Sequence, residues 1–128
     1  MLAAMKKLIP LTALVALLVG AAPSPGKDGD GRVARSGDCS GTSNWKLKAK
    51  PDDGRLEVEF EVDQNRNGVE WKVKLRRNGK TLVSTTRRTQ APSGSFSLER
   101  RIGDPAGTDK ISAVATRDGE TCRGALNV

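Results

Sequence analysis

Residues 45–62 read WKLKAKPDDGRLEVEFEV, and apolar and charged side chains alternate on both sides of a Pro-Asp-Asp-Gly turn. The charged residues are lysines before the turn and mainly glutamates after it. A period of two is typical of a β-strand with one buried face and one wet face. We therefore predict an antiparallel hairpin with opposite charges side by side on its wet face. The expected register pairs Lys48 with Glu57. It likewise pairs Lys46 with Glu59.

The same alternation continues along the chain, interrupted by turn signals. Asn78-Gly79 and Asp118-Gly119 are sequences typical of tight hairpins. Arg100 falls on an apolar position, which predicts a bulge or a strand end there. No window has helical periodicity, so the prediction is an all-β fold, a seven-stranded antiparallel β-sandwich of the immunoglobulin/fibronectin III kind. The expected strands span residues 45–50, 56–63, 69–76, 80–89, 95–102, 109–117 and 120–128.

The N-terminal part of the chain has the composition of a targeting segment followed by a spacer. Two lysines precede an almost wholly apolar run that ends in small residues and proline, which predicts a cleaved signal peptide over residues 1–22. The run is short for a membrane span, and a retained signal anchor is the alternative. Residues 23–37 are Gly, Pro, Ser and charges, predicting a disordered spacer. The β-sandwich domain is expected over 38–128, in a secreted, extracellular protein with no membrane span after cleavage.

Two cysteines in an exported chain indicate one disulfide, between Cys39 and Cys122. The Asp118-Gly119 hairpin is expected to pair Ala115 with Cys122, which directs the Cys122 side chain inward. The Asn78-Gly79 hairpin is expected to pair Leu75 with Leu82. A cross-link near both ends of so small a domain restricts its unfolded chain.

The stretch CSGTSNWKLKAKPDDGRLEVEFEVDQNRNGVEWKVKL, followed by NGK, SGSF, AGTD and GETCRG, resembles small secreted proteins of high-GC Gram-positive bacteria. These proteins have a signal peptide and one β-sandwich domain with two terminal cysteines. The resemblance covers roughly residues 38–128. It implies the fold and the compartment, and it carries over no functional residue.

The composition argues against enzymatic chemistry. The chain has no histidine, the usual general base and the commonest zinc ligand, and a disulfide leaves no thiolate. Glutamates alternate with apolar residues over 57–61 and face lysines, which favours a structural charged face over a catalytic pair. Residues 63–68, DQNRNG, match the opening of a calcium loop, but Lys74 stands where a bidentate glutamate is needed. We therefore expect a polar turn, no cofactor, no metal site and no enzymatic activity.

Basic residues outnumber acidic ones, 22 to 15, giving a formal charge of +7. Several flank the Asn78-Gly79 hairpin and form a candidate contact surface for an anionic partner. The alternative is that they protect edge strands against aggregation. Nucleic acid is a less favoured partner because no exposed aromatic platform accompanies the charge. The candidate residues are Lys72, Lys74, Arg76, Arg77, Lys80, Arg87 and Arg88.

The sequence therefore predicts a secreted, non-enzymatic binding or structural module at the cell surface. An anionic cell-wall polymer or a secreted or surface protein is the expected kind of partner. Loops 63–68, 90–94 and 103–108 are further candidate contact regions, since loops on rigid scaffolds often carry function. The alternative is an inhibitor of a secreted protease acting through residues 89–93. Trp45 and Trp71 are expected in the core, with a ligand contact as the alternative for Trp45.

Overall fold

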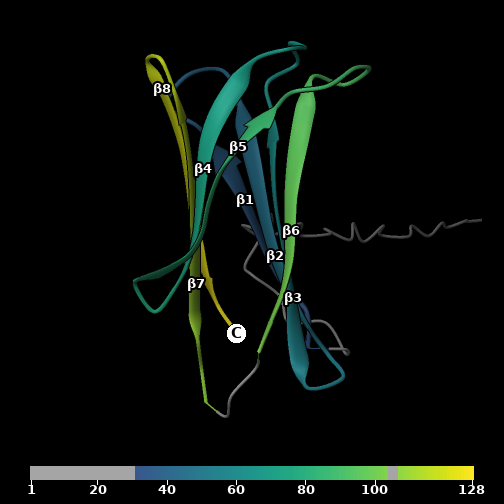
Figure 1. The fold of residues 1–128 in the computed structure, drawn as a ribbon, viewed down its shortest axis with the longest axis vertical. Coiled ribbons are helices and arrows are strands. Elements are labelled where there is room, and N and C mark those ends of the chain that lie inside the picture. Colours follow the sequence, from purple (N-terminus) through teal and green to yellow (C-terminus); the bar gives the residue numbers. More distant parts are fainter. Residues whose placement is uncertain (1–30, 104–106) are drawn as a thin grey trace, which may run out of the picture.

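The computed structural model describes residues 31–103 and 107–128. These residues form strands in two four-stranded antiparallel sheets, ordered β1-β2-β3-β6 and β5-β4-β7-β8, which face each other in Figure 1. β8 packs against β1 and β2 on one side of the sandwich, and β5 lies against β6 on the other. The strands are β1 (Val33–Asp38), β2 (Asn44–Asp52), β3 (Arg55–Asp63), β4 (Glu70–Arg77), β5 (Lys80–Arg88), β6 (Ser95–Gly103), β7 (Lys110–Arg117) and β8 (Glu120–Asn127).

The all-β fold and its antiparallel sandwich are confirmed, but the described residues contain eight strands where seven were predicted. The additional strand is β1, which occupies part of the predicted spacer. Its single buried apolar side chain is Val33. The other residues of β1, up to Asp38, are held by antiparallel pairing with β2. The spacer prediction is therefore wrong for residues 33–37. The predicted signal peptide, residues 1–22, and residues 23–30 of the predicted spacer lie outside the described residues.

Two predicted hairpin registers are shifted. Lys48 faces Glu59, not Glu57, because the first hairpin turns on Asp53-Gly54 alone. Both turn residues have positive φ, 51° and 76°, as a two-residue hairpin loop requires. Opposite charges still face each other, because Lys46 now lies opposite Glu61 as Lys48 lies opposite Glu59.

The second shift lies between β4 and β5. A bulge between Leu75 and Arg76 places Leu75 opposite Val83 instead of Leu82. The predicted pairing of Ala115 with Cys122 is confirmed.

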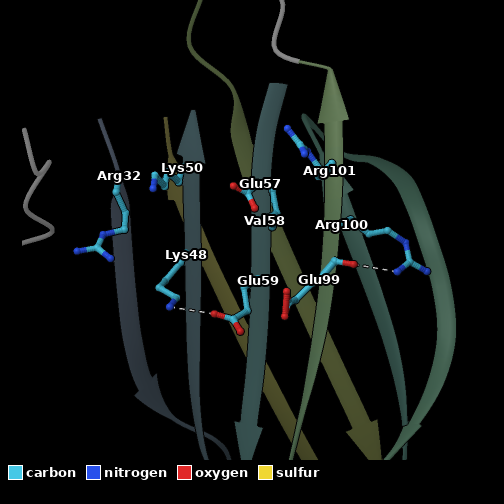
Figure 2. A pocket seen from close by; sticks show the side chains of 9 residues that line it. All are labelled: Arg32, Lys48, Lys50, Glu57, Val58, Glu59, Glu99, Arg100 and Arg101. Carbon is cyan, nitrogen blue, oxygen red and sulfur yellow. Dashed lines mark hydrogen bonds and ion pairs between the residues drawn. The ribbon is translucent and has the colours of Figure 1, made fainter. Parts of the chain in front are cut away.

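The predicted irregularity at Arg100 is also wrong. β6 keeps its register with β3 through Gly103. Because β6 is an edge strand, the exposed Arg100 side chain reaches solvent and lies beside the sheet in Figure 2. A charge on the inward side of an edge strand discourages pairing with another chain.

The core lies between the sheets and is built from the alternating apolar residues that the sequence indicated. Trp71 is fully buried at its centre, 6.1 Å from the ring of Phe96, which confirms its predicted core position. Trp45 is only partly buried and packs against the core. It closes the side of the sandwich where β8 meets β1 and β2, with Gly37 and Gly124 against its ring.

Gly124→Ala is expected to lower the free energy of unfolding by about 1–2 kcal/mol, because overpacking displaces the Trp45 ring that packs against the core. A Cβ at this position would overlap Cζ3 of Trp45, so the indole must move. Urea unfolding measures the loss, and Gly103→Ala is the matched control, since no atom lies within 4 Å of its Cβ. Equal unfolding midpoints for the two variants would contradict the packing described here.

The Cys39–Cys122 disulfide is present and joins the residue after β1 to β8 across a sequence separation of 83. Both half-cystines are buried. In the part of the chain that the structure describes, no helix is long and apolar enough to cross a membrane.

Candidate binding face

Three of the predicted contact residues share one face of one strand. Lys72, Lys74 and Arg76 alternate along β4 with residues that fill the core, so their side chains lie on the outer face of the β5-β4-β7-β8 sheet. The bulge leaves this row intact. β4 pairs with β7 in unbroken register from Lys72 to Arg77. A regular row of cations therefore runs along an inner strand of the sheet.

The neighbouring strands add two cations that were not among the predicted contact residues. Lys74 faces Val114 of β7, and Val114 faces Arg123 of β8, so the three residues form one row across the sheet. Lys110 begins β7 on the same outer face. We name the set Lys72, Lys74, Arg76, Lys110 and Arg123 the basic face.

The basic face is hollowed. A shallow depression of about 440 Å³ lies over its centre, and one of about 200 Å³ adjoins it. Val114 lies under both, and hydroxyl side chains surround the cations. None of the lining residues is an aspartate or glutamate. The hydroxyl-bearing residues in the linings are Ser84, Thr85, Thr86, Ser112 and Thr116.

The charges of the basic face are not neutralised by their surroundings. Among residues 31–103 and 107–128, the ion pairs within 4.0 Å involve other cations, such as Arg88 with Glu70. The buried Nε of Arg76 also has no acceptor among the described groups. The arrangement is suited to holding an anion by charge-assisted hydrogen bonds.

The other four predicted contact residues lie elsewhere. The Arg77 guanidinium donates to the carbonyl oxygen of Gly103, and its Nε lies 3.8 Å from a carboxylate oxygen of Asp109. Arg87 donates to Thr85 and to the backbone of Thr86. Because side chains alternate along a strand, Arg77 and Arg87 stand at positions of β4 and β5 whose side chains leave from the inner side of the sheet.

The two remaining residues also fall outside the basic face. Arg88 donates to the carbonyl oxygen of Gly68, 2.9 Å away. Lys80 pairs with Arg77 at the hairpin end and lines neither depression. The predicted set therefore separates into three face residues and four hairpin or edge residues.

The outer face of the opposite sheet has a different charge pattern. A shallow groove of about 420 Å³ crosses β2, β3 and β6, and both signs of charge line it (Figure 2). Lys48 binds Glu59 at 2.9 Å, and Arg101 binds Asp52 at 3.2 Å. Glu99 lies directly opposite Glu59 on this open face. The glutamates of the predicted charged face are thus interleaved with cations.

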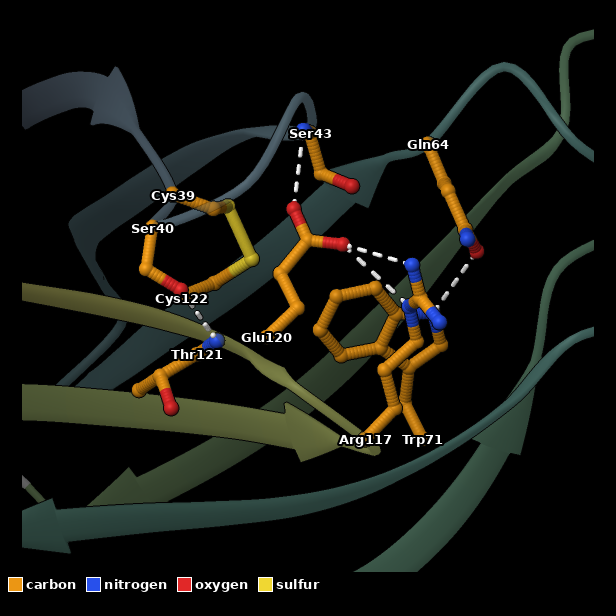
Figure 3. The surroundings of a disulfide bond; sticks show 9 residues. All are labelled: Cys39, Ser40, Ser43, Gln64, Trp71, Arg117, Glu120, Thr121 and Cys122. Carbon is orange, nitrogen blue, oxygen red and sulfur yellow. Dashed lines mark hydrogen bonds and ion pairs between the residues drawn. A yellow bond between two sulfur atoms is a disulfide. The ribbon is translucent and has the colours of Figure 1, made fainter.

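A buried polar network lies beside the disulfide at one end of the sandwich (Figure 3). The Glu120 carboxylate accepts from the backbone N–H of Ser43 at 2.9 Å and from Arg117 at 3.0 and 3.2 Å. The Arg117 guanidinium lies 5.5 Å from the ring centroid of Trp71, whose Nε1 donates to Gln64 at 3.1 Å. The network joins both sheets around the core tryptophan.

Two opposing influences set the protonation of Glu120. Burial is the largest and raises its pKa, because water no longer solvates the charge. The hydrogen bond from the Ser43 backbone and the adjacent Arg117 guanidinium together outweigh burial, so the pKa of Glu120 lies below its ordinary value. The ionised carboxylate is therefore part of the folded structure, and each of its oxygens has a donor.

Residues 63–68, which match the opening of a calcium loop, form a hydrogen-bonded turn. Asp63 accepts from the backbone N–H of Asn65 at 3.1 Å, as an Asx turn does. The carbonyl oxygen of Arg66 accepts from the Thr89 hydroxyl, and Gly68 donates to the Thr89 carbonyl. Within the described ranges, no group of three or more Asp, Glu, Cys or His residues is placed to hold a metal ion.

The loop proposed for protease inhibition is anchored at its first residue. Thr89 is buried, with backbone hydrogen bonds to the 63–69 segment, whereas residues 90–93 are exposed. Gln90 bridges to Ser95, which closes a short turn. Loop 103–108 lies partly outside the described residues.

Comparison of the chain with protein-family models, with curated proteins and with solved structures found no match.

Proposed function

We propose that the protein is a secreted, non-enzymatic binding module that holds an anionic partner at the cell surface on its basic face. The observation that carries this proposal is the difference between the two outer faces. On one sheet, cations alternate with carboxylates that neutralise them. On the other, the lining of both depressions contains cations, hydroxyls and small apolar groups without a carboxylate. Unopposed charge of one sign concentrates and steers an oppositely charged partner.

The fold supports a scaffold role of this kind. Strands β2-β3-β6 and β5-β4-β7-β8 follow the neighbour order of strands A-B-E and C′-C-F-G in immunoglobulin-type sandwiches. We therefore propose that the domain is a variant of the immunoglobulin/fibronectin III kind, with β1 added beside the first strand. Such sandwiches serve widely as cell-surface domains, although the fold alone assigns no partner. Secretion is supported by the buried disulfide, which persists in oxidising compartments.

Lys74→Glu is expected to weaken retention of the purified protein on cell-envelope fractions of its own host by about tenfold or more, because reversing a charge replaces attraction with repulsion. Lys74 lies at the centre of the basic face and lines both depressions. Retention is measured by co-sedimentation at low and at high salt, and added salt should lower it steeply for the wild type.

Lys46→Glu is the matched control. Lys46 is also an exposed, outward lysine within a strand, but it belongs to β2 on the opposite face. The two variants have the same net charge, so a nonspecific charge effect would weaken both equally. Equal retention of the Lys74→Glu and Lys46→Glu proteins would overturn the proposed function.

A further inference from the structure

We propose that the basic face binds a linear phosphodiester polymer whose phosphates are joined by three-carbon polyol units, with the polymer lying along β4. This inference rests on the proposed function and specifies the chemistry of the partner. It depends on three properties of the basic face: the spacing of its cations, the donors beside them, and the paired backbone of β4, which leaves no free backbone groups for a peptide to pair with.

The spacing of the cations matches the repeat of such a polymer. Lys72, Lys74 and Arg76 occupy every second position of β4. Two residues of an extended chain contain six backbone bonds and rise about 6.6–6.8 Å. A phosphodiester with a three-carbon linker also has six bonds between successive phosphorus atoms. An extended polymer can therefore stay in step with the strand, and each phosphate meets one cation.

Residues on the adjacent strands supply further hydrogen-bond donors beside each β4 cation. Lys72 lies between Thr86 and Thr116, which are its partners on the two adjacent strands. Arg76 has Ser112 beside it. Such hydroxyls donate to phosphate oxygens or pair with hydroxyls of a polyol.

The middle cation of the β4 row, Lys74, has a second cation near it across the sheet. Lys74 has Ser84 on one side and, beyond Val114, Arg123 on the other. Two strand spacings, about 9.5 Å, separate the backbones of Lys74 and Arg123. Both side chains are long enough to reach a phosphate that lies between them over Val114. Arginine in particular suits the bidentate recognition of phosphate.

The same surface is poorly suited to an acidic peptide. A peptide laid across a sheet face loses water from its own N–H and C=O groups, and peptides that bind sheets find partners for these groups at an edge. β4 is an inner strand whose backbone is paired on both sides, with β5 and β7. A phosphodiester backbone has acceptors only, and the charged groups of the basic face are all donors.

Single-stranded nucleic acid has the same six-bond repeat but needs a platform for its bases. Proteins that bind single strands stack the bases on exposed aromatic rings. On the described strands, Phe60, Trp71 and Phe96 are buried between the sheets, and Trp45 closes the seam beside β8. The basic face itself has no aromatic ring in its lining.

The test measures binding of the purified protein to synthetic glycerol phosphodiester oligomers by calorimetry at several salt concentrations. Affinity should rise steeply from one phosphate to three, one for each β4 cation, and only gradually beyond that. Lys74→Gln should weaken binding of the three-phosphate oligomer about tenfold and lower the slope of log K against log salt by about one. Arg123→Gln should behave alike, and Lys46→Gln should leave binding unchanged.

Several outcomes would overturn the inference. Equal or tighter binding of polyglutamate or single-stranded DNA with the same number of charges would assign the face to another class of polymer. The affinity could also prove independent of oligomer length, or unchanged by Lys74→Gln. Either result would show that the β4 cations do not bind successive phosphates of the polymer. If envelope retention still depends on Lys74 in any of these cases, the proposed function stands and only the phosphodiester assignment fails.

Discussion

Replacing both Cys39 and Cys122 with alanine is expected to lower the free energy of unfolding by about 4–5 kcal/mol. The disulfide closes a loop with a sequence separation of 83, and a cross-link across so long a loop removes much of the entropy of the unfolded chain. The loss is large relative to the stability of a small domain, about 5–15 kcal/mol in total. The double variant is therefore expected to be only marginally folded at physiological temperature.

Urea unfolding of the oxidised wild type and of the double variant measures this loss. The wild type in reducing agent is the matched control, and its midpoint should coincide with that of the double variant. A difference would mean that the alanines disturb packing, since both half-cystines are buried in the core. A loss below about 1 kcal/mol would show that residual structure already restricts the unfolded chain without the cross-link.

Glu120→Gln is expected to lower the free energy of unfolding by about 2 kcal/mol at neutral pH, because it leaves the partly buried Arg117 guanidinium, whose side chain is 27% exposed, without its charged partner. Glu120 is 4% exposed and accepts from both Ser43 and Arg117. The glutamine has the same shape but no charge, and only one of its two terminal atoms can accept. Denaturant unfolding at pH 7 measures the effect.

The effect of Glu120→Gln should depend on pH. Because the folded-state pKa of Glu120 is lowered, its contribution is fully present above the ordinary glutamate value of about 4.3. It is lost as the pH falls below that value through the folded-state pKa. The stability of the wild type and the variant should therefore converge in acid, and the variant should lack this part of the acid transition.

Glu70→Gln is the control for the same chemical change at an exposed site. The Glu70 side chain is 62% exposed and its oxygen lies 4.0 Å from Arg88, so we expect a loss within about 0.5 kcal/mol. A Glu120→Gln effect equally small, or one that does not change between neutral and acidic pH, would contradict the role assigned to the buried carboxylate.

The alternation of side chains was enough to predict the sandwich, because burial of one face of a strand leaves a period of two in the sequence. β1 was missed for a physical reason. It has one buried apolar residue, Val33, and is held by backbone pairing to which side-chain composition contributes little. The first hairpin was misaligned although its sequence contains Asp53-Gly54, the same signal as Asp118-Gly119. The proline and aspartate before it suggested a longer turn than the structure has.

The sequence predicted the part of the candidate site that lies on one strand, but not the parts that neighbouring strands contribute. The alternation along one strand was enough to predict Lys72, Lys74 and Arg76. The same alternation indicates that Arg77 starts on the inner side of the sheet, since it continues the series Val73, Leu75. Lys110 and Arg123 join the face because β7 pairs with β4, a choice of neighbour that no local pattern encodes. Once that pairing is known, the predicted β7–β8 hairpin places Arg123 correctly.

The position of the disulfide determines how the domain would carry a mechanical load. Tension applied from the N-terminal side of Val33 and from Val128 passes along β1 to Cys39, crosses the sulfur bridge to Cys122 and leaves along the rest of β8. Residues 40–121 lie outside this path. A pulling force can therefore peel β1 and the end of β8, including Arg123, from their neighbours. The cations on β4, Lys72, Lys74 and Arg76, stay folded and able to hold their partner.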